Sequence, residues 1–231
     1  MAEDAISITG SAAAGKRALR IRMRAMRLSL PAAERMRAAE AIVPHLLSLP
    51  ECRVPGYVAG YWAIGGELPL HVLQLRLPPE VVWCLPCIQP DDSLRFAPWR
   101  PGDPLLSNRF GIPEPDLGPD AQLRAADMAL ILLPLLAFSR DGQRLGMGGG
   151  FYDRSLAFRR SGPLPPRLVG VGYAAQESPA WPGEDWDVHL DAVVTERGLV
   201  ERGFVERGVV ERGIVEPAPA SQVAPPAPDH Q

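Results

Sequence analysis

The sequence predicts an α/β fold, a three-layer Rossmann-like α/β/α sandwich around a mostly parallel sheet. Short apolar strands alternate with Pro- and Gly-rich connections and with helical segments along the chain, as expected for repeated βα units. The segment 128–136 is apolar on both faces, which is typical of a central strand covered on both sides. A length of 231 residues is enough for one sizeable core.

The N-terminal part of the chain predicts two helices. Residues 1–15 are small and polar, and we expect them to be disordered. A basic amphipathic helix is expected from Lys16, because apolar side chains then recur at helical spacing. These side chains are Leu19, Met23, Met26 and Leu30. A second helix is expected from Pro31 through Ala41, with Pro44 kinking or ending it.

The middle of the chain predicts the sheet. The expected strands are residues 55–61, 81–86, 127–136, 167–173 and 192–195. Helical segments are expected between some of them, at residues 70–77 and 152–160. Together with the basic helix, these elements form one expected domain, residues 16–197.

The C-terminal part has an unusual composition. The pattern Glu-Arg-Gly-x-Val occurs four times from Glu196 to Val215, and a Pro/Ala-rich segment, residues 216–231, follows. A five-residue period with a glycine in each unit cannot bury a core alone. We interpret residues 198–215 as a duplication of the flank of the last strand, dispensable for activity, and residues 216–231 as a disordered tail. The alternative is a partner-binding appendage.

Composition excludes several classes of protein. A formal charge of −3 and a pI of about 5.8 give no reason to expect nucleic acid as a partner. The sequence has no run of about 18 apolar residues for a membrane span and no secretory signal, and its three cysteines are too few for a disulfide framework. The arginine-rich N-terminus faintly resembles a mitochondrial presequence, but Glu3 and Asp4 precede it. We expect a cytoplasmic monomer that acts on small molecules.

Positive charge is concentrated near the N-terminus. Eight basic residues stand against one acid, Glu34, in this stretch: Lys16, Arg17, Arg20, Arg22, Arg24, Arg27, Arg35 and Arg37. Such an excess attracts polyanions such as nucleotides. RNA or an acidic membrane is an alternative partner, but aromatic residues are not interleaved and there is no second basic patch.

A glycine-rich loop carries the strongest chemical signal. The segment Arg-Leu-Gly-Met-Gly-Gly-Gly-Phe-Tyr-Asp-Arg, residues 144–154, follows a predicted strand and opens a predicted helix. Its glycines allow backbone amides to approach a ligand, and a helix start favours anions, so we expect a phosphate site. Arg144 and Arg154 flank the loop, and Asp153 is placed to hold a metal ion that bridges phosphate oxygens. The loop matches neither a Walker motif nor the dinucleotide motif, whose last glycine is replaced by Phe151. A glycine-rich turn without a ligand is the alternative.

This loop closely resembles the signature loop of 5-formyltetrahydrofolate cyclo-ligases. Other segments agree with that family in order and spacing, over roughly residues 16–196. They are Lys16-Arg-Ala-Leu-Arg20, Tyr61-Trp-Ala-Ile-Gly-Gly-Glu67, Phe110-Gly-Ile-Pro-Glu-Pro115, Ala137-Phe138 and Trp186-Asp-Val-His-Leu-Asp-Ala-Val-Val-Thr195.

The resemblance implies roles for individual residues. It implies ATP binding by Lys16, Arg17, Arg20, Arg144, Leu145, Gly146, Met147, Gly148, Gly149, Gly150, Phe151 and Tyr152. It implies catalytic roles for Lys16, Arg144 and Arg154, and folate contacts by Trp62, Glu67, Met147 and Phe151. Asp153 and Asp187 would bind Mg²⁺. Judged singly, a tryptophan such as Trp62 is more often a core residue than a ligand contact, and Asp187 is an ordinary surface carboxylate. Glu67 is equally well explained as a solvated loop acid.

The implied reaction uses ATP as co-substrate and Mg²⁺ as cofactor. ATP would phosphorylate the formyl oxygen on N5, N10 of the folate would attack the activated carbon, and phosphate would leave. The products would be 5,10-methenyltetrahydrofolate and ADP. Phosphoryl transfer needs positioning and charge neutralisation more than a covalent nucleophile, which suits these residues.

The sequence departs from the family pattern at three places. Met147 replaces a common basic residue, Leu68 and Pro69 follow Glu67 where polar residues are usual, and the tail is long. These departures bear on rate and affinity. They also keep open a second function, a non-catalytic nucleotide- or folate-binding protein on the same fold.

The motif Trp83-Cys-Leu-Pro-Cys87 suggests a redox site at first sight. Such a site needs a helix to start at the first cysteine, whereas Pro90 follows closely here and we expect both cysteines at a strand end. A zinc site would have only Cys52 as a further thiolate and lacks histidines at ligand spacing. We therefore assign neither function to this motif.

Overall fold

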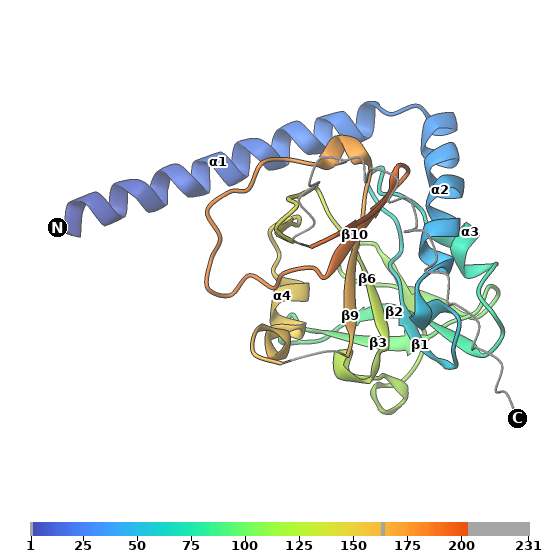
Figure 1. Cartoon of the computed structure of the whole chain (residues 1–231). Coiled ribbons are helices and arrows are strands. Elements are labelled where there is room, and N and C mark those ends of the chain that lie inside the picture. Colours follow the sequence, from blue (N-terminus) through green and yellow to red (C-terminus); the bar gives the residue numbers. More distant parts are fainter. Residues whose placement is uncertain (1, 163–164, 203–231) are drawn as a thin grey trace, which may run out of the picture.

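The computed structural model describes residues 2–162 and 165–202, with side chains from residue 13 onward. Its centre is a seven-stranded sheet in the order β11-β10-β9-β6-β1-β2-β3 (Figure 1). The strands are β1 (Gly56–Ala59), β2 (Val81–Ile88), β3 (Leu94–Pro98), β6 (Leu130–Pro134), β9 (Arg167–Val171), β10 (Ala192–Thr195) and β11 (Gly198–Glu201). The five inner strands are parallel, and β3 and β11 pair antiparallel at the two edges. This arrangement confirms the predicted α/β fold with a mostly parallel sheet.

Helices and two small hairpins surround the sheet. The α-helices are α1 (Ala2–Ser29), α2 (Ala32–Leu47), α3 (His71–Gln74) and α4 (Phe151–Ser155). The 3₁₀ turns are η1 (Pro50–Cys52), η2 (Pro119–Ala121), η3 (Ala125–Asp127), η4 (Ala157–Arg160) and η5 (Ala174–Gln176). The hairpins are β4 (Leu105–Ser107) with β5 (Pro113–Pro115), and β7 (Ala137–Phe138) with β8 (Arg144–Leu145).

The strand order places a topological switch point between β1 and β6. From β1 the chain first builds β2 and β3 on one side, and then β6, β9, β10 and β11 on the other. The connections that leave β1 and β6 therefore diverge at the carboxyl ends of these strands. In open α/β sheets this is where ligands bind.

The central strand β6 is covered on both faces, as predicted. Leu130 and Leu132 pack in the cluster formed with α2 and α3, whereas Ile131 and Leu133 pack in the cluster that contains Leu156, just after α4. All four side chains are buried. Alternate residues of one apolar strand thus contribute to two separate halves of the core.

Both N-terminal helices extend beyond their predicted bounds. Helix α1 begins at Ala2 instead of Lys16, and its N-terminal part extends beyond the body of the protein (Figure 1). Alanine, the best helix former, recurs in this segment and favours the extension. The prediction that residues 1–15 are disordered is therefore wrong for the helical residues from Ala2. Helix α2 continues through Pro44 to Leu47, because Ile42, Val43 and Leu46 are buried on either side of the proline. Packing therefore offsets the hydrogen bond that proline removes.

The first C-terminal repeat belongs to the sheet, which corrects the domain boundary predicted at residue 197. Residues of β11 pair with β10 in register, with Leu199 opposite Val194 and Val200 opposite Val193. Glu201 also accepts a hydrogen bond from Arg167, at 2.8 Å. The predictions for the later repeats and for residues 216–231 lie outside the described residues.

Cys84 lies in the middle of β2, whereas Cys87 is its penultimate residue, so the predicted position at a strand end holds for Cys87 alone. Both are buried, and burial raises the pKa of each thiol to about 12. A redox site requires an accessible thiolate, so their environment disfavours that role.

No helix in residues 2–162 and 165–202 is long and apolar enough to cross a membrane.

Candidate functional site

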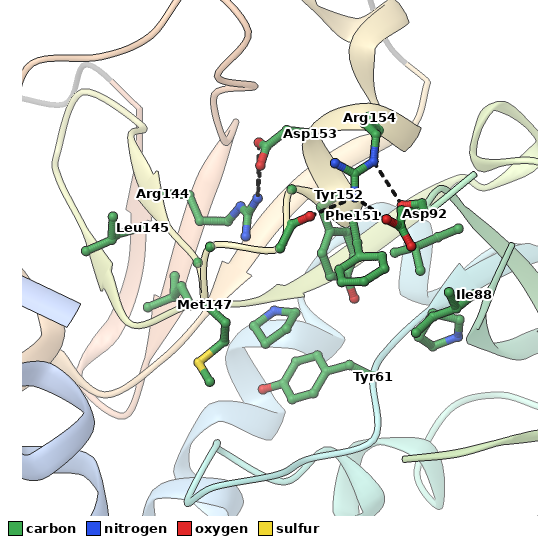
Figure 2. A pocket seen from close by; sticks show the side chains of 18 of the residues that line it. Tyr61, Ile88, Asp92, Arg144, Leu145, Met147, Phe151, Tyr152, Asp153 and Arg154 are labelled. Atoms are coloured by element: carbon green, nitrogen blue, oxygen red, sulfur yellow. Dashed lines mark hydrogen bonds and ion pairs between the residues drawn. The ribbon is translucent and has the colours of Figure 1, made fainter. Parts of the chain in front are cut away.

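A cleft of about 1290 Å³ opens at the switch point of the sheet. Tyr61 and Trp62, which follow β1, line it together with Pro134 and Leu135 at the end of β6. The glycine-rich loop lies on the same cleft (Figure 2). The sheet topology therefore brings the predicted phosphate loop to the place where α/β proteins bind ligands.

The loop needs glycine for its shape. It connects β8 to α4, and Gly148 and Gly150 adopt positive φ angles of 101° and 68°. Gly150 is the residue that precedes the first turn of α4. The predicted helix 152–160 is a five-residue α-helix followed by the turn η4, so its dipole is small. Cationic side chains must therefore supply most of the attraction for an anion.

Several arginines surround the loop, and Arg24 is one of them, since it donates to Sδ of Met147 at 3.4 Å. Arg144 forms an ion pair with Asp153 at 3.2 Å, and Arg154 donates to the carbonyl oxygen of Gly149 at 2.7 Å. Figure 2 shows Arg144 directed at Asp153, and Arg154 directed at Asp92. Arg20 reaches the loop from α1 and donates to the carbonyl oxygen of Gly146 at 3.0 Å.

Helix α1 also contributes Lys16 to the site. Its ammonium group lies 3.1 Å from a carboxylate oxygen of Glu184 and 3.8 Å from one of Asp187, and its side chain is only 9% exposed. The helix is held in place by an apolar cluster in which Met23 packs with residues of the β7–β8 hairpin, Ala137 and Leu145. The basic helix predicted from the sequence therefore does reach the glycine loop.

The two predicted metal ligands open onto the same cleft. Asp153 comes from α4, and Asp187 from the segment before β10. Each is already paired with a cation of the site, Arg144 or Lys16. Among the residues that the structure describes, no three His, Cys, Asp or Glu side chains gather as a metal site. Mg²⁺ commonly takes one or two carboxylates together with substrate phosphates, so this donor set fits Mg²⁺ bound with a nucleotide.

A second group of residues forms the other part of the cleft. Trp62 is partly exposed and meets Trp99 edge-to-face at 5.8 Å between ring centroids, so it is not a core residue. Phe151 meets Phe110 edge-to-face at 5.7 Å. Glu67 is buried and forms an ion pair with Arg27. The interpretation of Glu67 as a solvated loop acid is therefore wrong.

The structure brings nearly all predicted site residues together. Each of them lines the cleft except Arg17, which is exposed and points elsewhere on α1 because it follows Lys16 directly. Arg27, Asp92 and Glu184 contact site residues but received no site role from the sequence. Arg27 follows Lys16 by eleven residues, or about three helical turns, so helical periodicity could have placed both on one face.

The fold and the site together define a class of protein. An open, mostly parallel sheet with a glycine loop, and with basic and acidic side chains lining a cleft at its switch point, is an α/β enzyme scaffold.

Comparisons with known proteins identify the family. Residues 12–196 match the model of the 5-formyltetrahydrofolate cyclo-ligase family. A 5-formyltetrahydrofolate cyclo-ligase of Haemophilus influenzae is 35% identical over 176 residues, 74% of this chain and 92% of that protein. The Escherichia coli K12 cyclo-ligase is 33% identical over 177 residues, 75% of this chain and 96% of that protein.

A solved structure agrees with this match. The 5,10-methenyltetrahydrofolate synthetase of Aquifex aeolicus superposes with a TM-score of 0.69 at 31% identity, covering 87% of this chain and 98% of that one. The chain belongs to the 5-formyltetrahydrofolate cyclo-ligase family, and the resemblance seen in its glycine loop is confirmed.

Proposed function

We propose that the protein converts 5-formyltetrahydrofolate to 5,10-methenyltetrahydrofolate in a reaction that depends on ATP and Mg²⁺ and releases ADP and phosphate. One observation carries this proposal. The glycine loop with its cations, and the pair Trp62 and Glu67, open onto one cleft, so a nucleotide and a folate can meet there.

The triphosphate binds at the glycine loop. Lys16 and Arg20 approach from α1, while Arg144 and Arg154 approach from the two ends of the loop. Lysine and arginine neutralise phosphate oxygens, and arginine can do so through two parallel hydrogen bonds. These four side chains therefore orient the terminal phosphate and stabilise the charge that develops during its transfer.

The carboxylates of Asp153 and Asp187 would hold Mg²⁺ together with a bound nucleotide. The metal would supply charge neutralisation for phosphoryl transfer. Lys16 and Arg144 pair with these carboxylates in the structure, so the cations for the phosphate oxygens and the ligands for the metal lie side by side.

The folate binds at the other part of the cleft. The rings of Trp62 and Phe151 offer flat apolar surfaces for the pterin and its neighbouring ring. Glu67 accepts hydrogen bonds from the amino-pyrimidine edge of the pterin, where N–H donors stand side by side. This orientation presents the formyl group to the nucleotide.

The reaction then proceeds in two stages. The formyl oxygen attacks the terminal phosphorus of ATP, the bond from that phosphorus to the bridging oxygen breaks, and ADP leaves. N10 attacks the formyl carbon and loses its proton, and the carbon–oxygen bond breaks with release of phosphate. The product carries the formyl carbon between N5 and N10 as a methenyl bridge.

The test is the near-UV absorbance of the methenyl product. Purified protein is mixed with 5-formyltetrahydrofolate and MgATP, with parallel samples that lack ATP or contain EDTA. We expect the chromophore to grow only with ATP and Mg²⁺ present, together with one ADP released per product. Tight ATP and folate binding without product would instead support a non-catalytic binding protein and refute the proposal.

A further inference from the structure

A charged pair lies under the folate part of the cleft. The side chain of Arg27 is 1% exposed and that of Glu67 is 7% exposed, and Nη1 of Arg27 lies 3.4 Å from Oε1 of Glu67. Glu67 lines the cleft, whereas Arg27 lies behind it. Any influence of Arg27 on a ligand is therefore indirect, through the residues that it contacts.

Arg27 also holds the backbone around this carboxylate. Its Nε donates to the carbonyl oxygen of Gly65 at 2.9 Å, and Nη1 donates to that of Leu135 at 3.3 Å. The backbone amide of Ile64 donates to Oε2 of Glu67 at 3.0 Å. One guanidinium thus links α1, the turn that carries Glu67 and the segment after β6, so it fixes where the carboxylate points.

Burying these two charges is not explained by stability. Two ions lose their hydration on burial, and well-packed apolar side chains of similar volume are often equally or more stabilising. In addition, the Nη2 atom of Arg27 is buried without a hydrogen-bond partner among the described residues. A site that keeps this arrangement needs the carboxylate for its chemistry.

The electrostatics explain what Arg27 contributes. Burial raises the pKa of Glu67, while the Ile64 amide and the Arg27 guanidinium lower it. The other titratable groups that act on this pair are the hydroxyls of Tyr61, Tyr152 and Tyr173, and the guanidinium of Arg24, whose charge lowers the pKa of Arg27. Burial raises the pKa of each hydroxyl, so these hydroxyls stay neutral near pH 7. The net effect is a raised pKa, and Arg27 is the positive charge that, after the Ile64 amide, offsets part of the effect of burial on Glu67.

The ionised form matters for recognition. A carboxylate only accepts hydrogen bonds, whereas a protonated carboxyl group presents an O–H donor that would meet the N–H donors of an amino-pyrimidine. Each oxygen of Glu67 has one protein partner and retains capacity for another. The carboxylate is therefore prepared to accept two N–H donors from the cleft side.

We propose that Arg27 is a positioning residue, which keeps Glu67 ionised and aimed at the amino-pyrimidine edge of the folate. This inference rests on the proposed function, because it takes Glu67 as the acid that recognises the pterin. It concerns folate binding and not phosphoryl transfer, so the two can fail separately.

The experiment compares Arg27→Gln with Arg27→Lys, and uses Arg22→Gln as the matched control. Arg22 is an exposed arginine on the same helix. Binding of 5-formyltetrahydrofolate without ATP is measured by calorimetry from pH 5 to pH 8, and turnover is measured with each substrate varied. Thermal unfolding identifies any variant that does not fold.

We expect Arg27→Gln to move the acidic limb of folate binding upward by about one pH unit or more, because an opposite charge at this distance lowers a carboxyl pKa by that amount. At pH values below both limbs, folate binding should weaken by roughly tenfold relative to the wild type, which corresponds to one pKa unit, while the KM for ATP stays within about twofold. Arg27→Lys keeps a positive charge and should retain most of the wild-type pH profile. Arg22→Gln should match the wild type throughout.

An unchanged pH limb in a folded Arg27→Gln protein would overturn the inference. So would equal losses for Arg27→Lys and Arg27→Gln, or a wild type that does not bind the folate. If Arg27→Gln does not fold, Arg27→Lys decides the question. A pH dependence of folate binding like that of the wild type would support the inference, and a shifted pH dependence would refute it. A wild type that binds the folate with the predicted pH dependence but makes no methenyl product would refute the proposed function alone.

Discussion

Lys16 and Arg17 are adjacent basic residues, and the structure predicts that only the replacement of Lys16 affects ATP binding. Lys16 lines the cleft with its ammonium group between Glu184 and Asp187, whereas Arg17 is exposed outside the cleft. Replacing each by alanine therefore separates a local site from a general effect of positive charge. Lys16→Ala should weaken ATP binding, and Arg17→Ala should not.

The magnitude follows from the contacts that Lys16 makes. A hydrogen bond between charged groups contributes about 1.5–3 kcal/mol, which corresponds to a rise of roughly 10- to 150-fold in the dissociation constant of ATP. Removing the ammonium also leaves Glu184 and Asp187 without this cation, and both carboxylates line the cleft. Their charge would repel the triphosphate, so we expect a value in the upper half of that range.

The assay measures the KM of ATP and of 5-formyltetrahydrofolate, and the dissociation constant of ADP by calorimetry. The direct binding measurement is needed because KM equals a dissociation constant only when chemistry is slow. The folate KM should change less than about threefold, and Arg17→Ala should leave both KM values within about twofold, as surface changes away from a site usually have small effects. A larger change in the folate KM than in the ATP KM would refute the placement of α1 at the nucleotide end of the cleft. Equal effects of Lys16→Ala and Arg17→Ala would mean that the basic helix only attracts the nucleotide through its overall positive charge.

Three further predictions test other parts of the molecule. Asp153→Asn should lower turnover at least roughly 100-fold at limiting Mg²⁺ because the metal loses a carboxylate, and an unchanged Mg²⁺ dependence would contradict the metal assignment. Gly150→Ala should cost about 1–2 kcal/mol in backbone strain and also reduce kcat/KM for ATP, since its Cβ would lie 2.8 Å from Nη1 of Arg154. Gly102→Ala is the control, because Gly102 also has a positive φ angle but a Cβ there would meet no neighbouring atom. It should leave kcat/KM unchanged, and equal losses of kcat/KM in both variants would contradict a specific role of the loop in ATP binding. A chain that ends at Arg202 should unfold at the same temperature as the full chain. A chain that ends at Arg197 lacks β11, so its free energy of unfolding should fall by roughly 2–4 kcal/mol, because apolar side chains and a sheet edge become exposed. Equal melting temperatures for the two truncated chains would show that β11 does not contribute to stability.

The buried strands of the fold were predictable because their composition is unambiguous. β10 has its predicted bounds, since four buried residues stand between Asp191 and Glu196. By contrast, β7 and β8 have two residues each, and only their mutual pairing defines them. The continuation of α2 through Pro44 was also missed, because the packing that compensates the proline is tertiary.

The glycine loop was predictable from sequence for a related reason. Its special backbone angles and its charged flanks lie within eleven consecutive residues. The pair of Arg27 and Glu67 could not be found in this way, because the partners are forty positions apart. Nothing local distinguishes Glu67, after two glycines, from an acid on a solvated turn, and only the assembled fold buries it.

The position of α1 has a consequence for the order in which the protein becomes functional during synthesis. Lys16 leaves the ribosome early, but its partner Glu184 follows 168 residues later. The apolar cluster that seats the helix also needs Trp181 and the β7–β8 hairpin. The chain can therefore build β1, β2 and β3 while the part of α1 around Lys16 and Met23 still lacks its partners. We expect the nucleotide site to be among the last parts to form, so that a nascent or truncated chain with a partial sheet does not yet bind ATP.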